Sequence, residues 1–405
     1  MPDAPHALRI AWAGPWNMRS AITEFGLALA AELAAAGHSM EIIRTETGPA
    51  ARLPPRPASL RVHPPGVVPS LAAFDALLVN LGNHYPYHGR APALLAAHPA
   101  TAILHDADMA DFAAGWQADP EPAPLAHLRH ATPLAPALAA LACAAVVHGP
   151  HQLAEIEAAC PGPVLKLPLA YDPPVPAPPR PIGPRLAIAT IGHVNPNKRA
   201  GQVIRALGGS PILAAHARYT LIGPVAPSEQ DRLLRVAAAF GAPAPEFTGW
   251  LPDAAMLDRL AGTDVMACLR HPATEGGSAS LVLALRSARP TLVSDTASYA
   301  EIPDDLVLRC PAGAEAPFIL RHLEWVLDNP DAARRMGEAA ACYARAVHSP
   351  AAYVRALLPF LVEATRAAPA LLAARTLGLA AARLGLPPGD PVPRSFLATL
   401  AELTQ

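Results

Sequence analysis

A proline-rich segment near the middle of the chain divides it into two parts. Residues 172–184 read DPPVPAPPRPIGP, so proline occupies seven of thirteen positions. Because proline fixes φ and lacks an amide hydrogen, this run excludes helix and central strand and favours an extended, semi-stiff linker. At 405 residues, the chain is long enough for two domains of ordinary size, one on each side of the linker.

Each part alternates short apolar runs with patterns of helical period. Buried strands are predicted at 8–14, 40–43, 76–80, 101–105 and 144–148, and after the linker at 186–191, 219–222, 246–248, 265–269 and 291–294. Helices are predicted at 22–36, 200–207, 228–240, 253–261, 279–288 and 316–327. This alternation indicates parallel sheets covered on both faces. Two arrangements fit: independent α/β domains on a tether, or two similar nucleotide-binding domains facing one cleft, with ligands at the carboxyl ends of the strands.

Composition excludes several classes of protein. With 52% hydrophobic residues and a net charge of -2, the chain is neither disordered nor a nucleic-acid binder. Its longest apolar candidate, residues 134–147, is too short to span a bilayer, and no secretory signal pattern opens the chain. We therefore expect a soluble, cytoplasmic protein. The cysteines are far apart, which favours reduced thiols over a disulfide framework or a zinc site.

The stretch 189–199, ATIGHVNPNKR, is the strongest candidate for a phosphate site. A strand enters a turn that contains Gly192, and a helix begins just after Lys198. Amide groups at a helix start and a nearby ammonium both favour an anion. The alternative is a solvated basic turn. Lys198 is one of only two lysines in the chain, the other being Lys166, which slightly favours a specific role.

Two further stretches follow strands of the second part. Residues 270–281, RHPATEGGSASL, combine a glycine pair with Ser278 or Ser280 as a helix cap, and Glu275 stands at the mouth of the loop. A capped helix after a glycine turn explains this stretch equally simply. Residues 247–253 carry Trp250 at a strand end, where it could stack on a nucleobase or serve as a packing residue.

In the first part, polar clusters follow two strands, at 81–88 and 103–106. His105 beside Asp106 could orient a substrate hydroxyl, or donate to one or to a developing negative charge. A purely structural histidine is the alternative. We expect both clusters on the cleft side of the sheet.

Together, these stretches resemble the retaining glycosyltransferases of family 4, over roughly residues 8–360. Segments 325–330 (WVLDNP) and 335–339 (RMGEA) add to the likeness. The resemblance implies an α/β fold of the GT-B type, with two facing Rossmann-like domains, parallel sheets and carboxyl-terminal crossover helices. The implied boundaries are 1–172 for an acceptor-side domain, 173–184 for the linker, 185–350 for a nucleotide-sugar-binding domain, and 351–405 for helices that cross back.

The resemblance also implies roles for individual residues. Lys198 would grip the donor diphosphate, and Glu275 would be the first glutamate of an E-x7-E loop that contacts the transferred sugar. The implied catalytic residues are His105, Lys198 and Glu275. The implied donor-binding residues are Gly192, His193, Asn197, Arg199, Gly223, Trp250, Leu251, Gly276, Gly277, Ser278, Ala279, Ser280 and Leu283. The implied acceptor-side residues are Ser20, Ala21, Asn83, His84, His88 and Asp106.

Three positions depart from the family pattern. Leu283 stands where the second glutamate of E-x7-E would bind the nucleotide ribose, and Ala21 replaces a glycine near the phosphates. His193 holds a position usually occupied by arginine, with Arg199 as the candidate to compensate. These departures bear on nucleotide affinity and identity.

The implied activity is retaining, metal-independent transfer of a sugar, as by a hexosyltransferase. The donor would be a nucleoside-diphosphate sugar and the acceptor a carbohydrate or a lipid-linked molecule, with no cofactor, metal or nucleic acid. Dispersed arginines of the first part leave room for peripheral membrane contact. The departures at Ala21 and Leu283 keep open a catalytically silent GT-B protein that acts as a binding partner or scaffold. A nucleotide-sugar epimerase is a third alternative.

Overall fold

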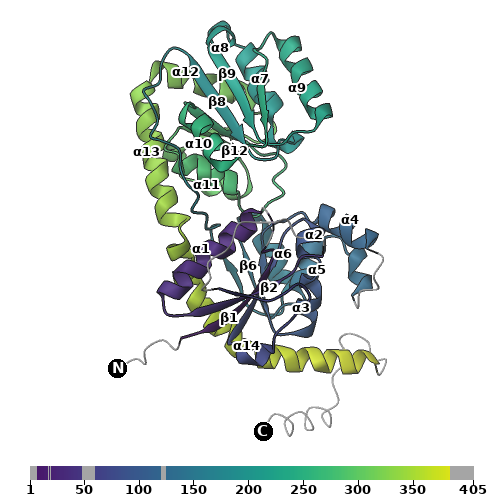
Figure 1. Ribbon diagram of the computed structural model, residues 1–405. Coiled ribbons are helices and arrows are strands. Elements are labelled where there is room, and N and C mark those ends of the chain that lie inside the picture. The colour runs from purple at the N-terminus through teal and green to yellow at the C-terminus, as the bar shows by residue number, and fades with distance from the viewer. Residues whose placement is uncertain (1–6, 17, 19, 48–59, 120–124, 384–405) are drawn as a thin grey trace.

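The computed structural model describes residues 7–16, 18, 20–47, 60–119 and 125–383 and contains two parallel β-sheets, one above the other in Figure 1. The first has the strand order β3-β2-β1-β4-β5-β6-β7 and the second β10-β9-β8-β11-β12-β13. In each sheet the strand order switches sides beside the first strand of that half, between β1 and β4 and between β8 and β11. Doubly wound sheets bind ligands at the carboxyl ends of the strands at such a switch point. The predicted α/β architecture with two parallel sheets is confirmed.

Most strands of the first sheet are buried on both faces, because helices cover both sides. Its strands are β1 Arg9–Gly14, β2 Ser39–Arg44, β3 Arg61–Val62, β4 Ala76–Leu81, β5 Thr101–Leu104, β6 Ala144–Val147 and β7 Val164–Lys166. Its helices are α1 Ala21–Ala35, α2 Tyr85–His88, α3 Ala91–Ala97, α4 Ala110–Ala118, α5 Leu134–Ala139 and α6 Pro150–Ala159. The short edge strands β3 and β7 escaped sequence prediction, because two or three residues show no usable periodicity.

The second sheet follows the predicted pattern closely. Its strands are β8 Leu186–Ile191, β9 Ala217–Ile222, β10 Glu246–Gly249, β11 Val265–Cys268, β12 Thr291–Asp295 and β13 Leu308–Pro311. Its helices are α7 Ala200–Gly208, α8 Pro211–His216, α9 Pro227–Phe240, α10 Asp253–Ala261, α11 Ala279–Arg286, α12 Ala316–Asp328 and α13 Pro330–Val347. Every strand and helix predicted for this half is present within a few residues, whereas β13, α8 and α13 were not predicted.

The chain crosses between the two halves twice, and the two crossings touch. The Tyr171 amide donates to the His348 carbonyl at 2.9 Å, and the His348 ring hydrogen-bonds the Leu169 carbonyl at 2.9 Å. The long helix α14, Pro350–Arg383, then runs back along the first domain, where Tyr353 and Leu357 are buried against it (Figure 1). The predicted return of the carboxyl-terminal helix to the first domain is confirmed.

The proline-rich linker is not a free tether, because it packs on the second domain. Arg289 is fully buried, and its guanidinium donates to the Ala177 carbonyl of the linker at 3.1 Å and to the Thr263 carbonyl at 2.8 Å. Arg180 of the linker pairs with Asp264. A buried guanidinium needs such carbonyl partners, and they fix the linker against the domain.

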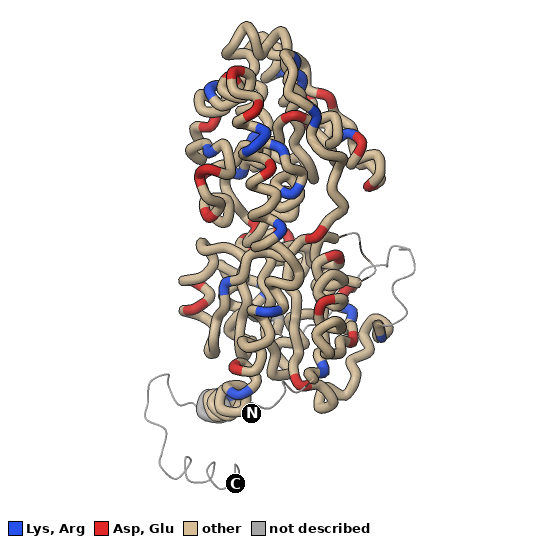
Figure 2. Tube along the Cα trace, turned by 90° about the vertical axis from the view of Figure 1, so that its left-hand side faces the viewer, with Lys and Arg blue, Asp and Glu red and all other residues tan. Residues whose placement is uncertain are grey.

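Charged residues are spread over both halves, with basic and acidic segments interspersed in the view of Figure 2. Among the residues that the structure describes, one helical stretch, Pro330–Gly378, is long and apolar enough to cross a membrane by length and composition alone. It comprises α13 and most of α14, and part of it packs on the protein through Ala340 and Leu361. All five cysteines are unpaired; Cys143, Cys160, Cys268 and Cys310 are buried and Cys342 is exposed.

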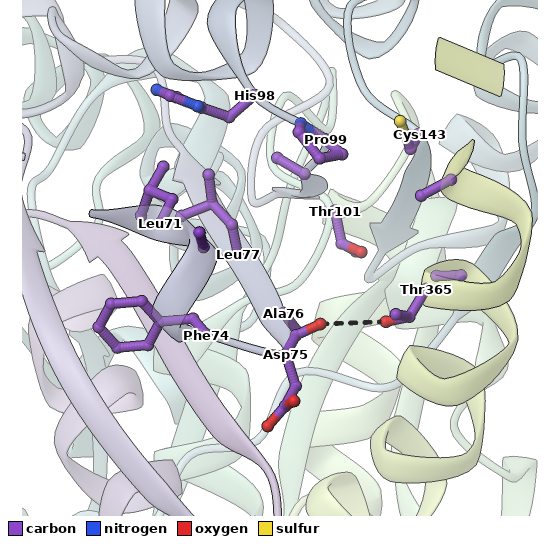
Figure 3. A pocket seen from close by; sticks show the side chains of 14 residues that line it. Leu71, Phe74, Asp75, Ala76, Leu77, His98, Pro99, Thr101, Cys143 and Thr365 are labelled. Carbon is purple, nitrogen blue, oxygen red and sulfur yellow. Dashed lines mark hydrogen bonds between the residues drawn. The ribbon is translucent and has the colours of Figure 1, made fainter. Parts of the chain in front are cut away.

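An apolar cavity of about 380 Å³ lies at the amino ends of β4 and β5 (Figure 3). Leu71, Phe74 and Leu77 line one side, and α14 closes the other. Thr365 of α14 donates to the Asp75 carbonyl at 3.3 Å across its edge. No lysine or arginine lines this cavity.

Candidate active site

The carboxyl ends of the two sheets meet around a pocket of about 290 Å³. From the first domain it is lined by Ser20, Ala21, Ile22, His105 and Asp106, and from the crossing segment by Leu169, Ala170 and Tyr171. The second domain contributes Arg270, Glu275, Gly277, Ser278, Ala279 and Ser280. Seven of the residues predicted for the donor and acceptor sides therefore line the same pocket, together with His105 and Glu275.

Two helices begin at this pocket, one from each domain. Ser20 caps α1, its hydroxyl accepting from the Ile22 amide at 3.2 Å. Ser278 caps α11 in the same way, accepting from the Leu281 amide at 3.3 Å. Free amides and the positive end of a helix dipole favour an anion, and here two helix starts face one space.

Arg270 and Glu275 form a buried ion pair at the second-domain wall. The Arg270 Nε donates to Glu275 Oε1 at 2.6 Å, and the Tyr299 hydroxyl donates to the same oxygen at 2.7 Å. Burial alone would raise the pKa of Glu275, but Arg270 and the hydrogen bond from Tyr299 hold it below its ordinary value. The Arg270 Nη1 also donates to Asn197 Oδ1 at 3.3 Å. Glu275 is therefore an ionised carboxylate that is held in place by Arg270 and Tyr299.

Lys198 lies beside the pocket, behind Ser280, and is not itself among the lining residues. Its Nζ donates to the Ile191 carbonyl at 2.7 Å. A Cβ placed on Gly192 would lie 3.2 Å from this Nζ and 3.1 Å from the Ser280 hydroxyl, so the three groups are neighbours. Burial, with help from Arg270, lowers the pKa of Lys198 to about 8. An anion entering beside Ser280 would restore the charge that burial disfavours.

Glycine is required where the β8 and β9 turns approach each other. Gly192 has φ +92 and Gly223 has φ +138. A Cβ on Gly223 would lie 2.3 Å from the Gly192 carbonyl oxygen, closer than any real contact. The backbones of the two turns are therefore in direct contact. The Lys198 side chain lies next to them, beside Gly192.

The loop before α11 is hydrogen-bonded directly to the first domain. The Gly276 amide donates to the His105 carbonyl, and the Ala107 amide to the Thr274 carbonyl, both at 2.8 Å. A Cβ on Gly276 would lie 2.1 Å from Gln152 Oε1. The glycine pair that the sequence suggested for ligand approach therefore also permits contact between the domains.

His105 is a neutral ring with a defined tautomer. The Asn80 amide nitrogen donates to the Ala13 carbonyl at 3.0 Å, so Asn80 Oδ1 must accept from His105 Nε2, also at 3.0 Å. Burial, reinforced by His148 and His88, lowers the pKa of His105 well below its ordinary value. The remaining nitrogen, Nδ1, carries a lone pair. In this tautomer Nδ1 is an acceptor and not a donor, and the expected role of His105 toward a substrate hydroxyl stays a prediction.

Asp106 is the second ionisable group on this wall. Its Oδ2 accepts from the Asn83 amide at 2.7 Å. Burial raises the pKa of Asp106 to about 7, against the Asn83 hydrogen bond and with a further contribution from Glu275. The charge on the first-domain wall therefore changes with pH near neutrality.

Several predicted residues lie away from the pocket. His84 and His193 are exposed. His88 is buried beneath the sheet end, where its Nδ1 contacts the Asn80 carbonyl at 3.0 Å. The Asn83 side chain is used inside the domain, accepting from the Phe112 amide at 2.9 Å.

Arg199, the candidate to compensate for His193, is not brought to the pocket. Its guanidinium forms two hydrogen bonds with the buried carboxylate of Glu315, at 3.0 and 3.1 Å. Arg270 supplies the second cation instead. Arg270 lies in the same sequence stretch as Glu275. Its orientation depends on a hydrogen bond to Tyr299, which is 29 residues away in the sequence, so no local pattern reveals it.

The positions expected near the nucleotide are apolar. Trp250 is 55% exposed after β10, and Leu251 is partly buried against the apolar cluster that contains Leu283. Leu283 itself is buried with Ile191 and Ile222. The fully described helix α11, with the sequence ASLVLALR, contains no acidic residue.

Sequence reasoning also missed Asn80, which orients His105, and Tyr171, which lines the pocket from the crossing segment. A polar residue inside the apolar β4 run was the available signal for Asn80. Within the described ranges, no group of three or more His, Cys, Asp or Glu side chains could hold a metal ion.

No protein-family model and no curated protein matches this chain. Solved structures do match over most of its length. Sucrose-phosphate synthase from Thermosynechococcus elongatus has a TM-score of 0.63 at 15% identity, covering 88% of this chain and 99% of that one. HepE from Anabaena, solved with UDP and glucose, has a TM-score of 0.59 at 13% identity, covering 88% and 99%.

WaaG, a glycosyltransferase involved in lipopolysaccharide biosynthesis, matches with a TM-score of 0.58 at 15% identity, covering 86% of this chain and 99% of that one. Identities this low establish the shared architecture and leave substrates open. The chain thus has the GT-B fold of glycosyltransferases, with two facing Rossmann-like domains and a carboxyl-terminal helix that returns to the first.

Proposed function

We propose that the protein is a retaining glycosyltransferase of the family 4 type, which moves a sugar from a nucleoside-diphosphate donor to a carbohydrate or lipid-linked acceptor. The observation that carries the proposal is the convergence of two capped helix starts and Arg270 on one pocket between the domains, with Lys198 next to Ser280 just behind its wall. Such a concentration of donors for an anion, placed at the carboxyl ends of both sheets, suits a diphosphate.

The chemistry needs charge stabilisation at the leaving group. As the bond between the anomeric carbon and the diphosphate oxygen breaks, the electron pair leaves with the diphosphate. The Lys198 ammonium, the Arg270 guanidinium and the amides at the start of α11 would offset that charge without a metal ion. Preorganised donors of this kind, held before reaction, are commonly the largest single contribution to catalysis.

The first domain would supply the acceptor side. Ser20, His105 and Asp106 line it. His105 Nδ1, as an acceptor, would suit a sugar hydroxyl, and the neutral imidazole would add no charge near the anionic donor. HepE, which shares the fold, was solved with UDP-glucose, which makes UDP-sugars the first donors to examine.

Titration calorimetry with UDP-, GDP- and ADP-sugars tests the proposal. We expect one base to be bound, with the matching diphosphate bound as well and the corresponding nucleoside bound weakly, because the diphosphate contributes most of the attraction. Arg270→Ala should abolish this binding. The absence of binding by any nucleotide sugar would contradict the proposal.

A second candidate is favoured by Leu283, whose apolar side chain replaces the expected ribose ligand. A catalytically silent GT-B protein could keep the cleft and lose turnover. Slow release of free sugar from a bound donor by the purified protein would exclude it. Donor binding without any product, over hours and with a range of acceptor sugars, would favour it.

A further inference from the structure

A cavity of about 620 Å³ lies in the first domain, apart from the candidate active site. Its walls come from the end of β2, the segment 66–68, the helices α2 and α3, and the end of α4. It shares no lining residue with the pocket between the domains. Pockets that bind small organic molecules usually measure about 300–1,000 Å³, so this cavity is large enough for a ligand of its own.

Much of the cavity wall is apolar. Trp116 and Leu94 line it from the buried side, and the lining residues Val67 and Val68 are 47% and 44% exposed. Exposed valines beside a concave apolar wall favour an apolar ligand, because binding removes the surfaces of both from water. The body of the ligand should therefore be hydrocarbon or aromatic.

Hydrogen bonds within the protein hold two walls of the cavity together. The Thr47 amide donates to the Pro86 carbonyl at 3.0 Å, and the Arg90 amide donates to the Thr45 carbonyl at 3.1 Å. The Thr45 hydroxyl also donates to the Tyr87 carbonyl at 2.9 Å. These bonds tie the segment after β2 to α2 and to the start of α3. A site formed in advance loses less conformational freedom when it binds a ligand.

Two arginines of the cavity wall converge on Glu46, which is buried. The Arg44 Nε donates to both carboxylate oxygens of Glu46, at 3.3 and 3.4 Å, and the Arg90 Nε donates to the Glu46 backbone carbonyl at 3.0 Å. Gly66, with φ +78, lies against Arg90, since a Cβ there would be 3.1 Å from the Arg90 Nη1. The two guanidinium groups are therefore close together and held in place.

These guanidinium groups keep donors that the protein does not use. In the described part of the chain, the Nη atoms of Arg44 and Arg90 have no hydrogen-bond partner, and no carboxylate pairs with Arg90. The Arg44 side chain is only 10% exposed. The carboxylate on the cavity wall, Asp119, accepts from the Tyr85 hydroxyl. An anionic group of a ligand would receive charge-assisted hydrogen bonds from the two arginines.

We propose that this cavity is a binding site for an amphiphilic anion, a small molecule with an apolar body and one carboxylate, sulfonate or phosphate group. The body would contact Val67, Leu94 and Trp116, and the anionic group would accept from Arg44 and Arg90. The cavity at the amino ends of β4 and β5 (Figure 3) is apolar without a lysine or arginine in its wall, so it would not favour an anion. Binding of the amphiphile would not depend on the proposed glycosyl transfer.

Two fluorescent probes that differ by a single charged group test the proposal. Anilinonaphthalene sulfonate has an aromatic body and a sulfonate, and phenylnaphthylamine is the same body without the sulfonate. The sulfonate probe should bind with a stoichiometry of one per chain. It should bind at least about tenfold more tightly than the uncharged probe, because hydrogen bonds to charged groups are the stronger ones. An apolar cavity without cations would show the opposite order, because the sulfonate would lose its hydration.

Arg90→Gln removes the charge and keeps a polar side chain. It should weaken binding of the sulfonate probe by about tenfold and leave binding of the uncharged probe unchanged. Arg44 is less suitable for substitution, because its loss would leave the buried Glu46 carboxylate without this cation. The control is Arg334→Ala, which removes an exposed arginine of α13 in the second domain and should change the binding of neither probe.

Ala93→Trp tests the apolar wall. Ala93 is exposed on α3 and lines the cavity, so an indole there would take up space that the ligand needs. This variant should weaken binding of both probes by at least about tenfold. The matched control is Ala114→Trp, an exposed position of α4 that does not line the cavity, and it should leave both affinities unchanged. Thermal unfolding shows that each variant is folded.

Three results would overturn the proposal. They are the absence of binding by the sulfonate probe, binding that is unaffected by Arg90→Gln or by Ala93→Trp in a folded variant, and an uncharged probe that binds as tightly as the charged one. Neither probe contains a nucleotide or a sugar. The result therefore stands whether or not the protein binds a nucleotide sugar, and a failure of the proposed function is distinguished from a failure of this site.

Discussion

The two walls of the cleft differ in how they carry charge. The second-domain wall has a buried guanidinium locked to a carboxylate, with an ammonium behind it. The first-domain wall has a neutral histidine and a carboxyl group whose pKa is raised to about 7. One wall is electrostatically fixed and the other can exchange a proton near neutral pH. In the proposed transfer, the fixed wall would hold the departing anion.

The largest effect should come from Arg270→Ala, which breaks the fixed wall. The change leaves Glu275 buried without its cation, and losing one partner of a buried pair costs about 3–5 kcal/mol of unfolding free energy. Thermal and chemical unfolding measure it. Arg334→Ala, which removes an exposed helical pair with Glu338, is the control and should cost about 0.5 kcal/mol or less. Equal effects of the two variants would show that the Arg270 pair is not the anchor of this wall.

Lys198→Ala should act on turnover more than on folding. Removing one preorganised donor lowers rates by about 10²–10³-fold, and the fold should persist, because α7 and the β8 turn keep their other contacts. The chain provides a matched control in its only other lysine. Lys166 pairs with Glu301 in a half-exposed bridge, so Lys166→Ala should leave turnover near wild type. Steady-state rates at saturating donor measure both, and near wild-type turnover of Lys198→Ala would reject its role.

Gly276→Ala tests whether the two walls must touch. The new methyl group would meet Gln152 Oε1 at 2.1 Å, so the loop before α11 has to move away from the first domain. Overpacking of this kind costs about 1–3 kcal/mol. Gly183→Ala in the linker, where no atom lies within 4 Å, should change unfolding by about 0.5 kcal/mol or less. If the two alanine variants are equally stable, the close contact between Gly276 and Gln152 of the first domain is contradicted.

The smallest effect should be a pH dependence of donor affinity from the fixed wall. Burial, then Arg270, lowers the pKa of Lys198 to about 8, and only its protonated form attracts a diphosphate. Affinity should therefore fall as pH rises through 8, by about tenfold between pH 7 and pH 9. Calorimetry of the nucleoside diphosphate at both pH values measures this. Lys198→Met should bind more weakly and show no such dependence.

Much of this arrangement could be predicted from the sequence, because alternation of apolar runs and helical patterns is a local property. Strands such as β8 and β11, and the turn before Lys198, followed from it. The place of Glu275 in the loop and the helix cap at Ser278 could also be predicted, because each depends on a few neighbouring residues in the sequence. The short strand β7 and the packing of the linker on Arg289 were not, because they depend on contacts distant in sequence.

The roles of individual polar groups were harder to predict for the same reason. Arg199 and Arg270 look alike in the sequence, yet Arg199 is held by Glu315 and Arg270 by Glu275 and Tyr299. The tautomer of His105 depends on Asn80, whose own orientation depends on Ala13. Only the folded chain brings these partners together, so residue type and spacing could nominate the site but not assign its charges.

The most direct test is a crystal structure of the protein soaked with the nucleoside diphosphate that binds best. The account predicts phosphate oxygens within hydrogen-bonding distance of the amides at Ser278–Ser280 and of the Lys198 ammonium, between the starts of α1 and α11. A diphosphate found on any other surface, or a pocket that stays empty at saturating concentration, would contradict it.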